Sequence, residues 1–226
     1  MQGEVFKEAL NPFDELARRY DRWFDSPWGR AIFALETACL KELMDGAGRT
    51  WLEVGVGTGR FARALGVLQG VDPSSPMLEI AGRRGVLTRK GYGEELPYPD
   101  DIFDGVLMVT TLCFLSDPGK TFIECARVLK NNGCLVLGFV PSDSPWGRLY
   151  IHKGGEGHPF YSPARFYTCE KALYLASAAD FYFERATSCL FTAPDKPLDD
   201  SMPHSRRVVN GAGFAGMKFI YVPAAE

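Results

Sequence analysis

The chain has 226 residues, of which 46% are hydrophobic and 23% charged, a composition that suits one globular domain. The formal net charge is −3 and no long run of Lys and Arg occurs, so we expect no nucleic-acid partner. No apolar stretch approaches the ~20 residues that a membrane helix needs, so membrane insertion is not expected. The N-terminus lacks the basic-then-apolar order of a signal peptide, which predicts a cytoplasmic protein.

The first fifth of the chain has a helical pattern over residues 11–45. Asn11-Pro12 is a typical helix start, with a cap followed by proline at the first helical position. Residues 26–29 interrupt the pattern, and a second helix is predicted over residues 30–44. The aromatic and aliphatic residues that fall on one face of the first helix are Phe13, Leu16, Tyr20, Trp23 and Phe24.

Residues 50–65, T-W-L-E-V-G-V-G-T-G-R-F-A-R-A-L, predict a strand, a tight glycine turn and a helix. Gly55, Gly57 and Gly59 let the backbone come close to a ligand, since a Cβ would prevent that approach. The helix that follows points free N–H groups at the same place. The turn is not a dinucleotide loop, because Arg60 replaces the last glycine of G-x-G-x-x-G, and no Lys-Ser or Lys-Thr completes a Walker loop.

The second strand, residues 66–72, ends in Asp72, where a carboxylate can accept hydrogen bonds from both hydroxyls of a ribose. The alternative is that Asp72 is an acid in the turn that leads into the next helix and has no contact with a ligand. Ser74-Ser75-Pro76 begins the next helix, predicted over residues 77–84.

Strands three and four are predicted at residues 86–90 and 105–110, separated by a turn-rich segment. A helix from Pro118 and a fifth strand at residues 134–140 follow. Repeated strand-helix units predict a doubly wound α/β sheet. The rest of the chain is predicted as an irregular, aromatic-rich lid over residues 141–168, a helix to about residue 179, and strands at 183–191 and 214–222.

Four ordered blocks, residues 51–65, 70–78, 91–104 and 127–138, resemble the motifs of class I S-adenosylmethionine-dependent methyltransferases. The pattern looks most like the small-molecule enzymes of the quinone-biosynthesis type. This resemblance implies S-adenosylmethionine as cofactor, leaving S-adenosylhomocysteine, and a Rossmann-like, seven-stranded sheet of order 3-2-1-4-5-7-6 with the last strand antiparallel. It implies a single domain, residues 1–226, with a helical cap at 1–48, a cofactor-binding core at 49–140, and a lid, helix and hairpin at 141–226.

The resemblance also assigns cofactor contacts residue by residue. Tyr92 stands where the family often has an Asp that meets the adenine, so only a stacking or bordering role is carried over. The Gly93 backbone contact needs no side chain, and Glu94 is either a second candidate for the adenine amino group or a solvated acid. The residues expected to bind the cofactor are Glu53, Gly55, Val56, Gly57, Gly59, Asp72, Pro73, Met77, Tyr92, Gly93, Glu94, Thr110, Thr111 and Tyr20.

Tyr20 and Asp21 match a Tyr-Asp pair that often borders the cofactor in this family. The alternative for Tyr20 is a packed aromatic face. Methyl transfer is an in-line displacement at a sulfonium methyl, and a general base is needed only for a hydroxyl or protonated amine acceptor. His152, His158 and Tyr20 are the candidates for such a base, each with a structural role as the alternative.

The six cysteines show no C-x-x-C spacing and no neighbouring His cluster, so we expect apolar fillers and no metal site. Cys113, near the end of strand four, is either such a filler or a reactive thiol. The aromatic cap and lid favour a flat or apolar small-molecule acceptor. A cofactor-binding sensor or scaffold, a nucleotide-dependent oxidoreductase and a homodimer remain as alternatives at this stage.

Overall fold

The computed structural model of the chain describes residues 12–44, 46, 48, 50–198 and 205–223. Asn11, the predicted cap of the first helix, lies outside the described residues. The division of the domain at residues 48 and 140 stays a prediction.

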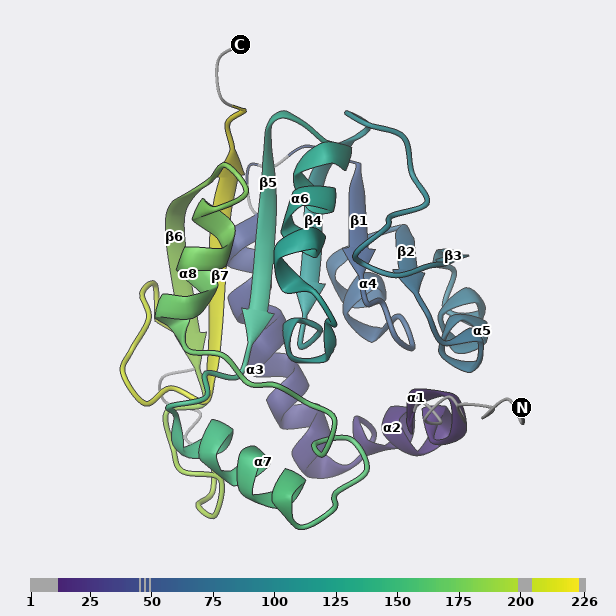
Figure 1. Cartoon of the computed structure of the whole chain (residues 1–226). Helices are drawn as coiled ribbons and strands as arrows, with labels where there is room; N and C mark the ends of the chain where they lie inside the picture. Colours follow the sequence, from purple (N-terminus) through teal and green to yellow (C-terminus); the bar gives the residue numbers. More distant parts are fainter. Residues whose placement is uncertain (1–11, 45, 47, 49, 199–204, 224–226) are drawn as a thin grey trace, which may run out of the picture.

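Seven strands form one mixed sheet: β1 (Trp51–Val54), β2 (Gln69–Asp72), β3 (Leu87–Lys90), β4 (Phe103–Val109), β5 (Leu129–Phe139), β6 (Phe181–Cys189) and β7 (Phe214–Tyr221). Their order is β3-β2-β1-β4-β5-β7-β6 (Figure 1), which confirms the predicted sheet. β1 pairs in parallel with β2 and β4, and β7 runs antiparallel to β5 and β6, as predicted for the last strand.

Helices cover both faces of the sheet. In Figure 1, α6 (Pro118–Val128) and α8 (Cys169–Ser177) lie in front of the strands, and α3 (Pro27–Met44) runs behind them. α4 (Arg60–Leu65) and α5 (Ser75–Arg83) pack on the same face as α3.

Alternate side chains of β1 pack into two hydrophobic clusters, one on each face of the sheet. Leu52 and Val54 pack in the cluster under α6 and α8, whereas Trp51 packs in the cluster under α3 and α4. All four residues of β1 are buried, which explains why three of them are apolar, and the fourth is the acid Glu53.

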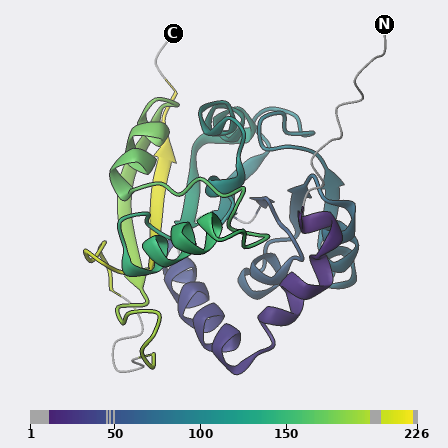
Figure 2. The same ribbon diagram turned by 60° about the horizontal axis from the view of Figure 1, so that its bottom comes forward.

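The carboxyl ends of the central strands face three helices. In Figure 1 the arrowheads of β4 and β5 point toward α1 (Pro12–Glu15), α2 (Ala17–Trp23) and α7 (Pro145–Gly155). Figure 2, which brings this end forward, shows α7 and the α1–α2 pair flanking the strand ends. The predicted helical cap is therefore present, and α7 adds a second element to it.

The prediction that residues 141–168 are irregular was wrong, because α7 lies within them. Ser144 caps this helix: its Oγ accepts a hydrogen bond from the Gly147 N–H at 2.9 Å. Trp146 anchors the helix, with its ring 2% exposed and its Nε1–H donating to the Thr192 carbonyl. Gly147 made the segment look like a loop, yet a Cβ there would lie 2.0 Å from the Pro141 carbonyl oxygen, so glycine is required for packing.

Several predicted boundaries shift by a few residues. β2 begins at Gln69 and not at Gly66, because Gly66 ends α4 in the left-handed conformation with φ 75°. α3 begins at Pro27 and includes Gly29, where a Cβ would lie 2.1 Å from the Trp23 carbonyl oxygen. β6 runs from Phe181 to Cys189, two residues earlier than predicted.

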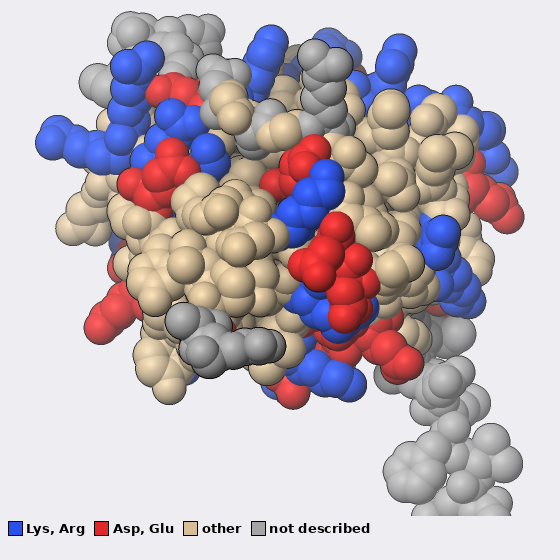
Figure 3. All heavy atoms as spheres, turned by 90° about the horizontal axis from the view of Figure 1, so that it is seen from above, with Lys and Arg blue, Asp and Glu red and all other residues tan. Residues whose placement is uncertain are grey.

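The surface seen in Figure 3 carries acidic and basic side chains side by side, and neither sign forms a continuous patch on this face. Within the described part of the chain, none of the helices combines the length and the apolar character needed to cross a bilayer.

Asp21 ties the cap to the sheet domain. Its carboxylate pairs with Arg60 of α4 and Arg84, which follows α5, each at 2.8 Å. Partial burial opposes ionisation, but hydrogen bonds from Arg60 and Arg84 prevail and lower the pKa of Asp21 to about 2. These bonds fix α2, and with it Tyr20, over the strand ends.

We expect Asp21→Asn to lower the free energy of unfolding by roughly 1–3 kcal/mol, because two arginines lose a charged partner. The lowered pKa of Asp21 means that the native protein keeps this stabilisation above the ordinary value of 3.8 and loses it as the pH falls through about 2. Urea denaturation at neutral pH measures the difference. Asp14→Asn, on an exposed site of α1, is the matched control. Equal stability of the two variants would contradict the anchoring role.

Candidate active site

A cavity of about 390 Å³ opens at the carboxyl ends of β1, β2 and β4, and we call it the strand-end cavity. Most of the predicted cofactor residues line it. These are Gly55, Gly57, Asp72, Pro73, Met77, Tyr92, Gly93, Glu94, Thr110, Thr111 and Tyr20.

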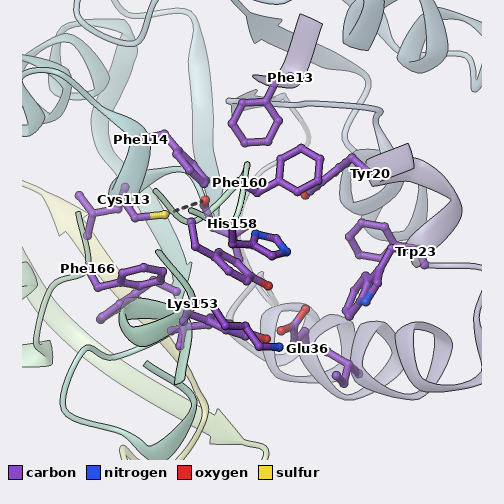
Figure 4. Close-up of a pocket in the computed structure, with 18 of the residues that line it drawn as sticks. Phe13, Tyr20, Trp23, Glu36, Cys113, Phe114, Lys153, His158, Phe160 and Phe166 are labelled. Carbon is purple, nitrogen blue, oxygen red and sulfur yellow. Dashed lines mark hydrogen bonds between the residues drawn. The ribbon is translucent and has the colours of Figure 1, made fainter. Parts of the chain in front are cut away.

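A second cavity of about 490 Å³ lies beneath α2, α3 and α7, and we call it the aromatic chamber (Figure 4). Phe13, Tyr20, Thr110 and Phe114 line both cavities, so the two meet at these four residues. The remaining rings of the chamber are Trp23, Phe24, Phe61, Phe139, Tyr150, His158, Phe160, Tyr161, Phe166 and Tyr167.

The glycine turn after β1 shapes the floor of the strand-end cavity. Gly55, Gly57 and Gly59 have φ values of 72°, 50° and 75°, which L side chains rarely adopt. A Cβ on Gly55 would lie 2.3 Å from the Thr111 side chain, whereas one on Gly57 would meet nothing within 4 Å and would enter the cavity. A side chain at position 57 would therefore take up space in the cavity, and the contact of Gly57 with a ligand stays a prediction.

Val56 and Gly59, which were predicted to bind the cofactor, do not line the cavity and instead pack the glycine turn against neighbouring elements. Gly59 begins α4, and a Cβ there would lie 3.0 Å from Ala81 of α5. The Val56 N–H donates to the Val71 carbonyl at 3.0 Å, and the Val56 side chain packs against Gly70 of β2. Both residues hold the turn against its neighbours.

Asp72 joins the turn to the end of β2. Its Oδ2 accepts a hydrogen bond from the Gly57 N–H and its Oδ1 from the Ser74 N–H, each at 2.9 Å. Burial raises the pKa of Asp72, while these two bonds oppose the shift. Each carboxylate oxygen keeps acceptor capacity for a further donor, because a carboxylate has about four lone-pair sites.

Glu53 lies in the middle of β1 and is 2% exposed. Burial raises its pKa well above the ordinary value, although the Ala62 N–H opposes the shift. Its Oε2 is buried and has no hydrogen-bond partner among the described residues. Glu53 does not line the strand-end cavity, so any contact with a ligand stays a prediction.

The segment after β3 forms the far wall of the strand-end cavity. Tyr92 is 63% exposed and Gly93 is buried, where a Cβ would lie 2.9 Å from Thr121. Glu94 is partly exposed, and its Oε1 accepts hydrogen bonds from the Ser116 and Asp117 N–H groups at 2.9 and 3.1 Å. Glu94 therefore holds the loop after β4 in place, and a contact with the adenine stays a prediction.

Thr110 lies at the junction of the two cavities in a strained conformation. Its φ is 50°, which is rare for a β-branched residue and is typical of functional sites. The Thr110 N–H donates to the Gly138 carbonyl of β5 at 2.7 Å. Thr111 turns toward the glycine turn, with its Oγ1 donating to the Gly55 carbonyl at 3.3 Å or the Val109 carbonyl at 3.0 Å.

Tyr20 and Asp21, which were predicted to border the cofactor as a pair, have different surroundings in the structure. Tyr20 reaches both cavities, and burial raises the pKa of its hydroxyl, with the Thr110 side chain opposing the shift. Tyr20 also packs edge-on against Phe13 and Phe24, so both roles weighed for it are compatible. Asp21 lines neither cavity and pairs with arginines instead.

The two candidate histidines differ in position. His152 lies outside both cavities, with its side chain 71% exposed and 3.3 Å from Glu156. His158 lines the aromatic chamber and stacks on Tyr161 at 4.3 Å. Burial lowers the pKa of His158, so its imidazole is neutral at physiological pH.

Cys113 faces the aromatic chamber, and its Sγ donates to the Thr110 carbonyl at 3.4 Å (Figure 4). Burial raises the pKa of the thiol to about 12, which keeps it protonated. This environment favours the filler over the reactive thiol. Among the described residues, no cluster of His, Cys, Asp and Glu able to hold a metal ion occurs.

Glu36 was not predicted as a site residue, yet it lies on α3 and lines the aromatic chamber. Glu36 is 6% exposed, and burial raises its pKa to about 8. A signal was available: Ile32, Glu36 and Leu40 recur every four residues, which places an acid on the buried stripe of a helix.

Comparison with known proteins agrees with this geometry. Residues 52–137 match a family model described as a methyltransferase domain. An uncharacterized protein of Mycobacterium tuberculosis is 41% identical over 204 residues, covering 90% of this chain and 72% of that protein. Demethylmenaquinone methyltransferase of Tropheryma whipplei is 34% identical over 173 residues, covering 67% of this chain and 68% of that enzyme.

A solved structure is similar over nearly the whole chain. It is an S-adenosylmethionine-dependent methyltransferase of Thermotoga maritima, described as a possible histamine N-methyltransferase. The TM-score is 0.84 at 36% identity, and the match covers 92% of this chain and 97% of that one.

The sheet order, the glycine turn and the acid at the end of β2 define a methyltransferase that uses S-adenosylmethionine. The chain belongs to the class I S-adenosylmethionine-dependent methyltransferases, and its relatives include enzymes of the quinone-biosynthesis type. The oxidoreductase alternative is thereby set aside.

We expect Asp72→Ala to weaken binding of S-adenosylmethionine and S-adenosylhomocysteine by roughly 1–3 kcal/mol, through lost charge-assisted hydrogen bonds. Isothermal titration calorimetry measures the change. Asp195→Ala, at an acid with its side chain 71% exposed, serves as the control. An unchanged affinity in Asp72→Ala would place the ribose elsewhere.

We expect Glu36→Gln to change the pH dependence of stability. Because the pKa of Glu36 rises from 4.5 to about 8 on folding, the folded state binds more protons between these values. The free energy of unfolding of the native protein therefore falls as the pH rises through that window, by up to about 1.4 kcal/mol per pH unit. The variant lacks this fall.

Urea denaturation at about pH 5 and about pH 8 compares the proteins across this window. Glu79→Gln, an exposed site on α5, makes the same chemical change as a control. If Glu36→Gln and the native protein lost stability equally on raising the pH, Glu36 would have an ordinary pKa.

Proposed function

We propose that this protein transfers a methyl group from S-adenosylmethionine, by in-line displacement, to a small acceptor with an apolar body bound in the aromatic chamber. The junction of the two cavities at Phe13, Tyr20, Thr110 and Phe114 carries the proposal. A donor in one cavity and an acceptor in the other would meet there without crossing bulk water.

The residues of the strand-end cavity fit the cofactor. The open space above Gly57 suits close approach of a ligand to the backbone, and the free lone pairs of Asp72 suit a pair of ribose hydroxyls. Tyr92 and Gly93 would border the adenine, and Met77, which is 1% exposed, adds an apolar surface.

S-adenosylmethionine, when bound, supplies a methyl group that is already activated by the sulfonium charge. The task left to the protein is alignment and exclusion of water. Thr110 is held rigidly between β4 and β5 by its hydrogen bond to Gly138, and Tyr20 is held by the anchored α2. Both side chains therefore present fixed surfaces to the reacting groups, which reduces the entropy lost on alignment.

The relatives support a small acceptor. The Tropheryma whipplei enzyme is named for demethylmenaquinone and the Thermotoga maritima protein for histamine, both of which contain a ring. A chamber of about 490 Å³ with aromatic walls suits a molecule of that kind. The shape of the chamber thus favours a small-molecule enzyme over a sensor or scaffold, which needs no second cavity beside the cofactor.

We expect Val140→Phe, which adds a ring to the wall of the aromatic chamber, to lower methyl transfer by roughly tenfold or more through misplacement of the acceptor. Its affinity for S-adenosylhomocysteine should stay within about twofold of the native value, because Val140 does not line the strand-end cavity. Transfer is measured with methyl-labelled cofactor and pooled metabolites.

Val222→Phe, at a position 40% exposed, is the matched control and should keep native transfer. Absence of label in any metabolite, with intact cofactor binding, would overturn the proposal and favour the sensor or scaffold. Full transfer by Val140→Phe would show that the acceptor binds elsewhere.

A further inference from the structure

One acid points into the aromatic chamber. Figure 4 shows the Glu36 carboxyl projecting from α3 toward the space enclosed by the aromatic side chains. Glu36 is 6% exposed, and no hydrogen bond or ion pair joins it to another residue in the described part of the chain. A buried carboxyl without a partner destabilises a fold, so its presence indicates a partner that arrives from outside.

The basic groups of the chamber do not neutralise this acid. Arg19 and Arg22 are exposed on α2, Lys153 is half-buried on α7, and none of them forms an ion pair with Glu36. The titratable groups that feel the charge of Glu36 are Tyr20 of α2, Tyr150 of α7, Tyr161 and Cys189 of β6. Burial raises the pKa of the three tyrosines, and the hydrogen bond with Cys39 followed by burial raises the pKa of Cys189, so these four groups add no negative charge to the chamber near pH 7.

The walls of the chamber favour a positive charge. Trp23, Phe160 and Phe166 present aromatic rings around the space into which Glu36 points. The faces of such rings attract cations, and the attraction grows when the cation is desolvated. An ammonium group would gain both the carboxylate and the rings, whereas a neutral hydroxyl would gain one hydrogen bond only.

We propose that the methyl acceptor is a small amine on a ring or other apolar body, and that Glu36 binds its ammonium group and accepts a proton from it. The proposal rests on the proposed function and names the class of acceptor for the same site. It makes Glu36 a catalytic residue, because the group touches the acceptor at the nitrogen that reacts.

The proton and electron changes balance. The ammonium N–H bond breaks and its proton passes to the Glu36 carboxylate, which frees the nitrogen lone pair. That lone pair forms the new N–C bond as the C–S bond of the sulfonium breaks, and the C–S electron pair stays on sulfur as a neutral thioether. The pKa of Glu36, raised by burial to about 8, lies within a few units of the ~10.4 of an alkyl ammonium, so the proton transfer needs little energy.

The test compares 2-phenylethylamine with its neutral analogue 2-phenylethanol, with the protein saturated by S-adenosylhomocysteine. We expect the native protein to bind the amine roughly tenfold more tightly by calorimetry, and Glu36→Gln to bind the two probes equally within about twofold. Glu79→Gln should keep the native preference. Because the readout is binding, it does not depend on turnover.

Two results would overturn the amine assignment. One is equal binding of both probes by the native protein, and the other is an unchanged preference in Glu36→Gln. Tighter binding of 1,4-dihydroxynaphthalene than of any amine would also overturn it, and would favour a hydroxyl acceptor.

A second measurement separates this inference from the proposed function. With 2-phenylethylamine and methyl-labelled cofactor, we expect labelled N-methyl product, and kcat/KM should rise with pH as Glu36 and the amine lose protons. In Glu36→Gln, the rise of kcat/KM that is caused by deprotonation of Glu36 should be absent, and only the rise caused by the amine should remain. Transfer of label to metabolites that lack an amine would keep the proposed function and refute the amine class, whereas no transfer to any metabolite would refute both.

Discussion

The hydrogen bonding of β1 to β2 on one side and to β4 on the other sets the position of the glycine turn, of Asp72 and of Thr110. The chain leaves β1 toward one edge of the sheet and returns at β4 toward the other, with helices on opposite faces. Where neighbouring parallel strands lead off in opposite directions, a crevice opens at their carboxyl ends. The glycine turn after β1 and Asp72 at the end of β2 lie at this place because the pairing puts them there.

The strand-end cavity and the aromatic chamber both lie at this crevice and share lining residues where they meet. α2, held by Asp21 to Arg60 and Arg84, places Tyr20 across the strand ends, and the strained Thr110 meets it from β4. Backbone strain and the burial of polar side chains lower the stability of a protein. They persist only where many surrounding contacts hold the residue in place. Glu36 belongs to the same group of features, since an unpartnered acid in an aromatic chamber destabilises the empty protein. The active site is therefore built on rigid elements, and these features lower the stability of the folded protein without ligand.

Sequence patterns predicted most of the sheet and much of the strand-end cavity for a physical reason. Buried parallel strands need apolar runs, and a turn that approaches a ligand needs glycine, so both leave local marks such as those at Trp51–Val54 and Gly57. α7 was missed because glycine has a low helix propensity, whereas Gly147 is required by the close approach of the Pro141 carbonyl, a contact that the sequence pattern does not show. The two hydrogen bonds that Glu94 accepts leave no local mark either, since the N–H groups of Ser116 and Asp117 lie more than twenty residues away in the chain.

Local residue patterns were enough to predict the fold class, the family and the glycine turn with its acid, because each rests on short motifs whose residues are close together in the chain. The tertiary structure alone decided that Tyr20 and Asp21, neighbours in sequence, point to different tasks, and that His152 lies outside the chamber while His158 lines it. It also showed that Glu36 forms no hydrogen bond or ion pair with any residue that the structure describes, which no local pattern can reveal. Burial and charge at a side chain are set by elements that fold against it from elsewhere, so they exist only once the chain has closed around the site.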